Sequence, residues 1–200
     1  MYKYTMQYRI IKNTQDTFLM EITQNSFRTR IEFDWTPEED FKGVAVCCNY
    51  HFKGNPIGFL KDNRLIRKQI DGKTERALFK IEDTDSMIQA GPSLIVEGKP
   101  KKNFKDEGFA THHILKGAHA HIGIKNSGNY VIGFTEQCTF NEMINTYQEL
   151  NCLNAIKLPG LKQFSFYFKS VKQKIEKGVF PIPVALIFEP RLDNLDEILS

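Results

Sequence analysis

The stretch Gln89-Ala90-Gly91-Pro92-Ser93-Leu94-Ile95-Val96-Glu97-Gly98-Lys99 does most to define the fold. It holds one apolar segment, Ser93–Val96, and the end of another, Met87–Ala90, each long enough for a short β-strand. Gly91-Pro92 breaks the run, because proline cannot donate a ladder hydrogen bond and glycine permits unusual backbone angles. We therefore predict two consecutive short strands with a turn between them.

Further strand-like segments lie on both sides of this stretch. Residues 27–33 alternate at period two, with Phe, Thr and Ile on one face and Arg and Glu on the other. Residues 44–48 form an apolar run without alternation, which predicts a strand covered on both faces. The remaining predicted strands are residues 8–11, 18–22, 77–81, 120–124, 130–134, 164–168 and 184–188.

One helix has a well-marked start. Thr139-Phe140-Asn141-Glu142 is a capping box, in which the Thr hydroxyl and the Glu carboxylate accept hydrogen bonds from otherwise unpaired N–H groups. Asn151 can end this helix in a left-handed conformation. We also predict a helical turn after Thr36-Pro37 and a short helix over residues 192–199. The apolar residues that share one face of the first helix are Phe140, Met143, Ile144, Tyr147 and Leu150.

Many strands and few helices predict an α+β fold, with a mixed or antiparallel sheet packed by a few helices. The 200 residues fit a single domain spanning residues 1–200. Hydrophobic residues make up 41% and charged residues 26%, as in ordinary globular proteins. A net charge of +3 is too small to predict a nucleic-acid polymer as partner.

The sequence also predicts the cellular compartment of the protein and the redox state of its cysteines. No apolar run approaches the roughly 18 residues of a membrane span, and the N-terminus lacks the apolar centre of a signal peptide. Cys47 and Cys48 are adjacent, and neighbouring cysteines rarely pair without strain. We predict that these two, with Cys138 and Cys152, are reduced thiols in a cytoplasmic protein without a membrane partner.

Three segments, in order, resemble the phosphodiester glycosidase family. Cys48-Asn49-Tyr50-His51-Phe52 and Gly54-Asn55-Pro56-Ile57-Gly58 are similar to the family's Asn-Gly-Gly-Phe-Phe turn and the Pro-hydrophobic-Gly element after it. The stretch at residues 89–99 resembles the family's Ala-Gly-Pro-x-Leu strand and is the most specific match. The third segment runs over residues 119–160. The resemblance covers about residues 44–168 and implies a phosphodiester-glycosidase-like domain.

The departures from the family pattern affect the chemistry that we expect. His119 stands where the family has an Arg. The family's Asp-Gly-Gly-Gly-Ser signature aligns with Pro159-Gly160-Leu161-Lys162-Gln163, which keeps only Gly160. The lost Asp removes a carboxylate, and glycoside cleavage normally needs a pair of them. We therefore expect a binding protein rather than an enzyme.

The expected ligand is a small phosphate-bearing sugar or a nucleotide-derived molecule. The resemblance and the gain of positively charged groups suggest these ligand-binding residues: Asn49, His51, Gln89, Gly91, Ser93, His119, Lys157 and Lys162. No metal site or cofactor is predicted, because the histidines within residues 112–121 lack a recognisable ligand spacing. Phosphate-binding loops, nucleophile elbows and dinucleotide fingerprints are likewise missing from the sequence.

Three functions remain open at this stage. The first is sequestration of the ligand without cleavage, as a virus could use against a nucleotide immune signal, with a homo-oligomer as one form. The second is a hydrolase that cleaves a sugar–phosphate linkage, in which His119 or His121 acts as acid or base and Glu136 and Asn49 orient the substrate. The third is a structural or assembly protein that keeps only the fold.

Overall fold

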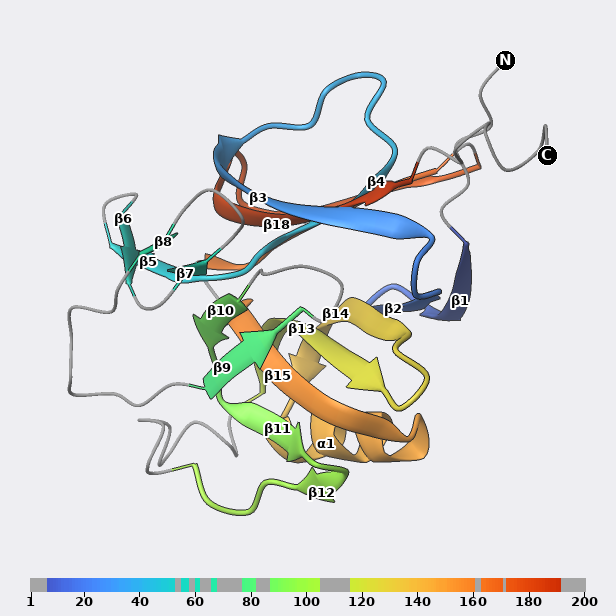
Figure 1. The fold of residues 1–200 in the computed structure, drawn as a ribbon, viewed down its shortest axis with the longest axis vertical. Coiled ribbons are helices and arrows are strands. Elements are labelled where there is room, and N and C mark those ends of the chain that lie inside the picture. The colour runs from blue at the N-terminus through green and yellow to red at the C-terminus, as the bar shows by residue number, and fades with distance from the viewer. Residues whose placement is uncertain are drawn as a thin grey trace, which may run out of the picture.

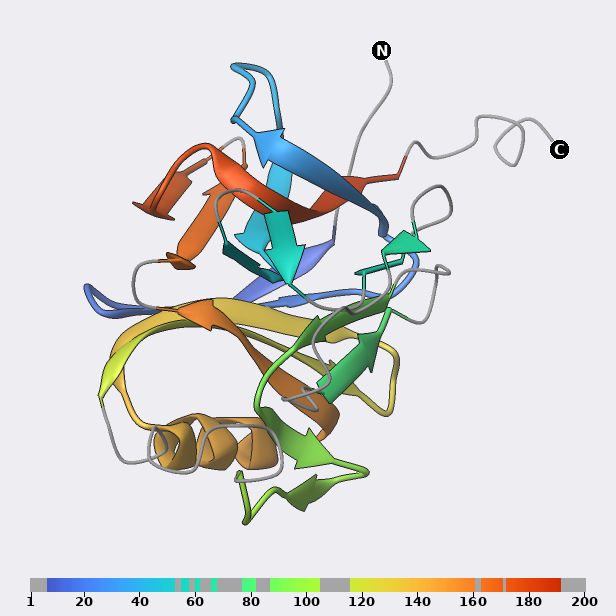
Figure 2. The same ribbon diagram turned by 90° about the vertical axis from the view of Figure 1, so that its left-hand side faces the viewer.

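Two large β-sheets packed face to face form the main body of the described structure, and a helix lies on the outer side of the larger sheet (Figures 1 and 2). The structure is a computed structural model. It describes residues 7–52, 55–57, 60–61, 66–67, 77–81, 87–104, 116–160, 163–170 and 172–191.

The larger sheet has seven strands, and every neighbouring pair is antiparallel. Strand β13 lies near its centre, between β14 and β15. In spatial order the strands are β1 (Tyr8–Asn13), β2 (Thr17–Ile22), β14 (Tyr130–Cys138), β13 (Gly117–Lys125), β15 (Cys152–Gly160), β11 (Ser93–Val96) and β12 (Lys99–Pro100).

The second sheet has five antiparallel strands. Its strand β4 is buried along its whole length. Val44 and Val46 face the larger sheet, whereas Ala45 and Cys47 pack on the outer side with Trp35. This confirms the prediction of a strand covered on both faces. In spatial order the strands are β17 (Lys174–Gly178), β16 (Ser165–Lys169), β4 (Gly43–Cys47), β18 (Ile182–Pro190) and β3 (Phe27–Trp35).

Short strands complete the fold at one end. A hairpin joins β5 (Tyr50–Phe52) to β6 (Asn55–Ile57). A four-stranded sheet has the order β8 (Ile66–Arg67), β7 (Leu60–Lys61), β10 (Met87–Ala90) and β9 (Ala77–Lys80). The chain leaves this small sheet after β10 and enters the seven-stranded sheet at β11, through a cis Gly91–Pro92 peptide. The predicted strand break therefore marks a passage between two sheets.

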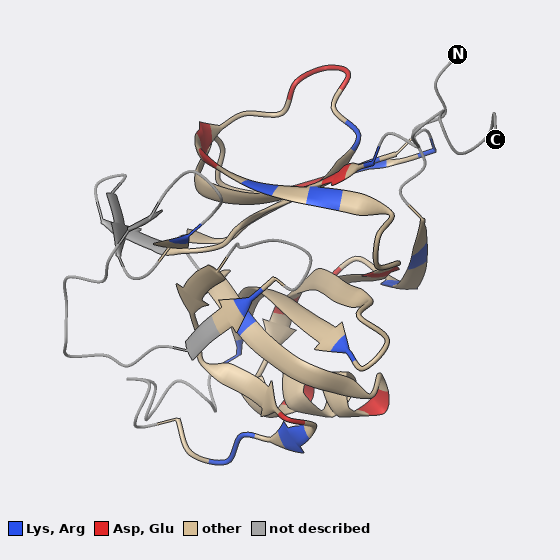
Figure 3. Ribbon diagram, viewed as in Figure 1, with Lys and Arg blue, Asp and Glu red and all other residues tan. Residues whose placement is uncertain are grey.

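Apolar side chains fill the space between the two large sheets. Phe166 of β16 lies at the centre of an aromatic group, with its ring centroid 5.2 Å from Phe134 and 5.6 Å from Phe18. The loop between β3 and β4 is acidic (Figure 3), whereas none of the apolar side chains between the two sheets is charged. The inter-sheet layer is thus an ordinary hydrophobic core.

Helix α1 (Phe140–Glu149) covers the outer face of the seven-stranded sheet (Figure 2). Its start is the predicted capping box: the Thr139 hydroxyl accepts from the Glu142 N–H at 3.3 Å, and the Glu142 carboxylate accepts from the Thr139 N–H at 2.7 Å. Asn151 follows its end with φ of 54°, as predicted. The buried helix residues are Phe140, Met143, Ile144 and Tyr147, again as predicted.

Two predictions of helical structure need correction. The described part of the chain contains one α-helix, so the fold is mainly β rather than α+β. The residues after Thr36-Pro37 form a turn, in which the Phe41 N–H bonds the Glu38 carbonyl at 3.2 Å. They supply one apolar side chain before Gly43, too few for an amphipathic helix. Residues 192–199 lie outside the described residues. No helix in the described ranges is long and apolar enough to cross a membrane.

Candidate functional site

Strand β13 has two different faces. Its inter-sheet face is apolar, whereas the face under α1 presents His119, His121 and Gly123. The His119 ring lies 5.6 Å from the Phe140 ring, and the His121 ring lies 5.4 Å from the Tyr147 ring. A side chain at Gly123 would collide with Tyr147, at 2.6 Å. The apolar face consists of Ala120, Ile122 and Ile124.

His119 is a buried histidine with unmet hydrogen-bonding capacity. Its exposed fraction is 6%, and neither ring nitrogen has a hydrogen-bond partner among the residues that the structure describes. Burial, with smaller effects of Lys157 and His121, lowers the pKa of His119 to about 3, so the ring is neutral near pH 7. Gly160 lies directly beside it, because an added Cβ there would be 2.6 Å from the His119 Nδ1. The glycine shared with the family signature therefore makes room for this ring.

Lys157 provides a buried positive charge nearby. It lies on β15, in register with His121 of β13, and its exposed fraction is 5%. Its Nζ donates to the Leu158 carbonyl at 3.0 Å and lies 5.9 Å from the centre of the Phe140 ring, next to which His119 also packs. Its backbone N–H donates to the Pro92 carbonyl at 3.0 Å, which ties β15 to the Gly91-Pro92 break.

Five of the sequence-predicted residues are buried polar side chains on neighbouring parts of the fold. The Asn49 amide donates to the Gln89 carbonyl at 3.3 Å, and both residues are buried. Ser93 pairs with Ile156, the neighbour of Lys157. We call the group formed by Asn49, Gln89, Ser93, His119 and Lys157 the buried polar cluster.

Three predicted ligand-binding residues relate to this cluster in different ways. Gly91 lies between Gln89 and Ser93, at the cis peptide. His51 lies in β5, and only its backbone is described. Lys162 lies outside the described residues.

His121 differs from His119 because both of its ring nitrogens have partners. The Nδ1 atom lies 2.7 Å from the Tyr147 hydroxyl, and the Nε2 atom lies 3.2 Å from the Thr135 hydroxyl. Burial lowers its pKa to about 3, so this ring is also neutral. Thr135 in turn hydrogen-bonds Cys138, whose burial raises the thiol pKa to about 11. Cys138 is therefore a protonated thiol near neutral pH and is not an activated nucleophile.

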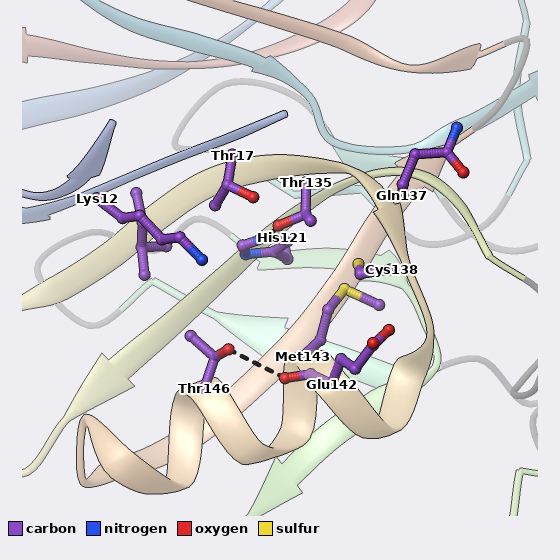
Figure 4. Close-up of a pocket in the computed structure, with 10 residues that line it drawn as sticks. Lys12, Thr17, His121, Thr135, Gln137, Cys138, Glu142, Met143 and Thr146 are labelled. Atoms are coloured by element: carbon purple, nitrogen blue, oxygen red, sulfur yellow. Dashed lines mark hydrogen bonds between the residues drawn. The ribbon is translucent and has the colours of Figure 1, made fainter. Parts of the chain in front are cut away.

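His121 also lies at the floor of a cavity of about 300 Å³ between α1 and the strands β1, β2, β13 and β14 (Figure 4). Thr17, Thr135 and His121 lie on its sheet side, and Met143 and Thr146 lie on its helix side. The sequence did not predict this cavity. A signal was nevertheless present, because a tyrosine at a buried helix position, as Tyr147 was predicted to be, needs a polar partner for its hydroxyl.

The carboxylate expected beside the histidines lies elsewhere. Glu136 forms an ion pair with Lys177 of β17 at 2.8 Å, and the Lys177 ammonium lies over the ring of Phe134. Glu136 thus faces the inter-sheet side, away from His119 and His121. Among the described residues, no three His, Cys, Asp or Glu side chains are grouped so that they could hold a metal ion. The four cysteines are free and buried.

Comparisons with known proteins address the family. The family model described as phosphodiester glycosidase matches residues 44–189, which starts where the sequence resemblance starts and continues through β18. No curated protein matches the chain at a significant level.

Two solved structures have a similar fold. One is a hypothetical protein from Synechocystis, with a TM-score of 0.62 and 11% identity over 93% of this chain; the chain spans 62% of that protein. The other is the catalytic domain of zebrafish N-acetylglucosamine-1-phosphodiester alpha-N-acetylglucosaminidase, auto-inhibited by its pro-peptide. It has a TM-score of 0.62 and 11% identity over 94% of this chain and 83% of that one. The family match covers most of the sequence, and this chain belongs to the phosphodiester glycosidase family.

Proposed function

We propose that this chain uses the buried polar cluster to bind a small phosphate-bearing sugar or nucleotide ligand without cleaving it. The observation behind the proposal is His119, whose two ring nitrogens are buried and lack protein partners within the described residues. The large majority of buried side-chain polar atoms in folded proteins are hydrogen-bonded, so such a group needs an explanation. A ligand that accepts a hydrogen bond from this ring would provide one.

The charge of the cluster favours an anionic ligand. Among its five described side chains, Lys157 is cationic, His119 is neutral, and none is a carboxylate. Phosphate oxygens accept hydrogen bonds from ammonium and imidazole N–H groups, and such charged bonds are roughly twice as strong as neutral ones. A phosphate group therefore matches the donors present.

The carboxylates near the buried polar cluster argue against cleavage of a glycosidic bond. Glycoside hydrolysis commonly uses two carboxylates on either side of the scissile bond. Glu136 is paired with Lys177, and Glu142 accepts two hydrogen bonds from Thr139 in the capping box. Pro159 occupies the position that aligns with the family's Asp, on the same strand as Lys157.

Hydrolysis of a sugar–phosphate linkage is the second candidate. Family membership supports it. The chemistry of His119 does not, since a pKa lowered to about 3 makes the neutral ring a weak base near neutral pH. The viral anti-defence role, the nucleotide signal and the homo-oligomer remain predictions from the sequence.

Calorimetric titration with N-acetylglucosamine 1-phosphate tests the binding proposal. One lost charged hydrogen bond predicts affinity about 10- to 150-fold weaker in His119→Ala. Lys157→Met should weaken binding similarly. Lys169→Met is its matched control, because Lys169 lies on β16 of the five-stranded sheet and its ammonium donates to the Glu39 carbonyl of the loop after β3. Absence of binding in the wild-type protein, or equal affinity in all variants, would overturn the proposal.

A second measurement separates binding from hydrolysis. The methyl diester of N-acetylglucosamine 1-phosphate is incubated with the wild-type protein, and the products are analysed by mass spectrometry. Recovery of intact diester is the expected result. Release of N-acetylglucosamine over many turnovers, lost in His119→Ala, would establish the hydrolase instead.

A further inference from the structure

The cavity beneath α1 is separate from the buried polar cluster. It contains no member of that cluster, and His121 and Thr135 form part of its floor. We propose that this cavity binds a neutral, hydroxyl-rich ligand of about the size of one monosaccharide ring. Its volume of about 300 Å³ is at the small end of the range for ligand sites.

The floor of the cavity is rigid and uncharged. His121 is 2% exposed and is held from both sides, by the Tyr147 hydroxyl at 2.7 Å and the Thr135 hydroxyl at 3.2 Å. A side chain fixed by two hydrogen bonds keeps one orientation, so the cavity retains its shape without a ligand.

The walls combine hydroxyl and amide groups with apolar surface. Thr17 and Gln137 line the cavity from the sheet, and Thr146 lines it from α1, where its hydroxyl donates to the Glu142 carbonyl at 3.0 Å. Leu19 and Met143 supply apolar surface between them. A sugar ring presents the same mixture, since its hydroxyls both donate and accept while its C–H groups are apolar.

The charges at the rim favour a neutral ligand. Lys12 extends from β1 on one side, and Glu142 lies on α1 on the other (Figure 4). The hydrogen bond from the Thr139 backbone N–H lowers the pKa of Glu142, so its carboxylate remains ionised. An anion would face this carboxylate and a cation would face Lys12, whereas a neutral ligand can bond to both.

Heteronuclear NMR titrations with D-glucose and N-acetylglucosamine test this inference. The expected shifts fall on Thr17, Thr135 and Thr146. Thr17→Val removes one wall hydroxyl with little change in shape, and it should weaken sugar binding about three- to tenfold. Thr23→Val, just beyond the other end of β2, is the matched control and should leave the affinity unchanged.

Inorganic phosphate, titrated in parallel, separates this inference from the proposed function. Phosphate is expected to shift the signals of His119 and Lys157 and to leave the cavity unchanged. The inference fails if neither sugar shifts the cavity residues, if Thr17→Val and Thr23→Val behave alike, or if phosphate rather than sugar occupies the cavity. Each of these results leaves the test of the polar cluster intact, because that test uses different residues and a different ligand.

Discussion

The two faces of the seven-stranded sheet bury very different side chains. The inter-sheet face packs aromatic and aliphatic groups such as Phe134 and Ile122 against the five-stranded sheet. The helix-side face buries His119, His121 and Lys157 together with apolar residues of α1. His121 and Lys157 are 2% and 5% exposed, nearly as buried as the inter-sheet residues, so these side chains differ from the inter-sheet ones mainly in chemistry.

Strand β13 belongs to both layers, because its successive side chains point alternately into the inter-sheet layer and into the helix-side layer. Burying a polar or charged group costs free energy unless the group gains partners. A sheet selected for stability alone would therefore bury apolar side chains on both of its faces. The far end of β13 obeys this rule: Lys125, Arg9 and Asn129 all donate to the Glu21 carboxylate. His119 does not, and the helix-side layer is therefore where binding is expected.

The largest predicted effect lies in the inter-sheet core. Phe166 is fully buried and contacts the rings of Phe18 and Phe134. Phe166→Ala should lower the free energy of unfolding by about 3–5 kcal/mol, because the lost transfer energy and the cavity add together. Urea denaturation followed by fluorescence measures it. A loss under about 1 kcal/mol would show that this layer is not the stabilising core.

The next effect is a pH dependence that only the helix-side layer should show. The pKa of His121 is lowered from 6.5 to about 3 in the folded protein, so the unfolded chain takes up its proton first as the pH falls. Stability is therefore complete above pH 6.5 and declines from there toward pH 3. At pH 5 the proton bound to His121 in the unfolded chain lowers the free energy of unfolding by about 2 kcal/mol relative to neutral pH.

The matched variant for this effect is His121→Gln, which keeps a side chain able to hydrogen-bond but cannot titrate. Between neutral pH and pH 5, the free energy of unfolding of this variant should fall by about 2 kcal/mol less than that of the wild type. Parallel curves for the two proteins would mean that His121 is already protonated, or is solvated, in the folded state.

Two further effects concern helix α1, which covers the helix-side layer. Thr139→Ala removes the N-cap hydroxyl of α1 and should cost about 1 kcal/mol. Ile144→Ala, on the buried face of the same helix, should cost about 2–5 kcal/mol because it leaves a cavity. Denaturation of both variants is compared with the wild type. If neither variant changes the free energy of unfolding, α1 does not pack on the sheet as the structure shows.

Local sequence patterns predicted the elements well. The alternation of residues 27–33, the apolar run at 44–48 and the Thr139 capping box each depend on neighbours in the chain, and each predicted an element that the structure contains. The alternation holds for Phe27 and Ile31, which are buried, but not for Phe33, which is exposed. The predicted α+β class was too helical because Pro37 after a capping threonine resembles a helix start, although no apolar face follows it.

The site was harder to predict because its contacts join distant strands. The sequence could place His119 and His121 on one face, since they are two residues apart on a strand. It could not show that His121 finds partners in Tyr147 and Thr135 whereas His119 finds none, because those partners come from α1 and β14. Likewise, the expected role of Glu136 assumed a facing that its ion pair with Lys177 does not support.

The smallest expected change in stability is the sharpest test of the comparison. His119→Leu replaces a buried, unpaired ring by an apolar side chain of similar size. Because both ring nitrogens are buried without partners, the replacement should remove a desolvation cost and raise the free energy of unfolding by about 0.5–1 kcal/mol. The same variant should lose binding of N-acetylglucosamine 1-phosphate, because leucine has no donor. Stability gained while binding is lost is the pattern expected of a residue kept for function.

Denaturation and calorimetry of the His119→Leu variant measure its stability and its binding. A marked loss of stability would instead make His119 part of the packing, and the helix-side layer would then be a second core that happens to contain polar side chains.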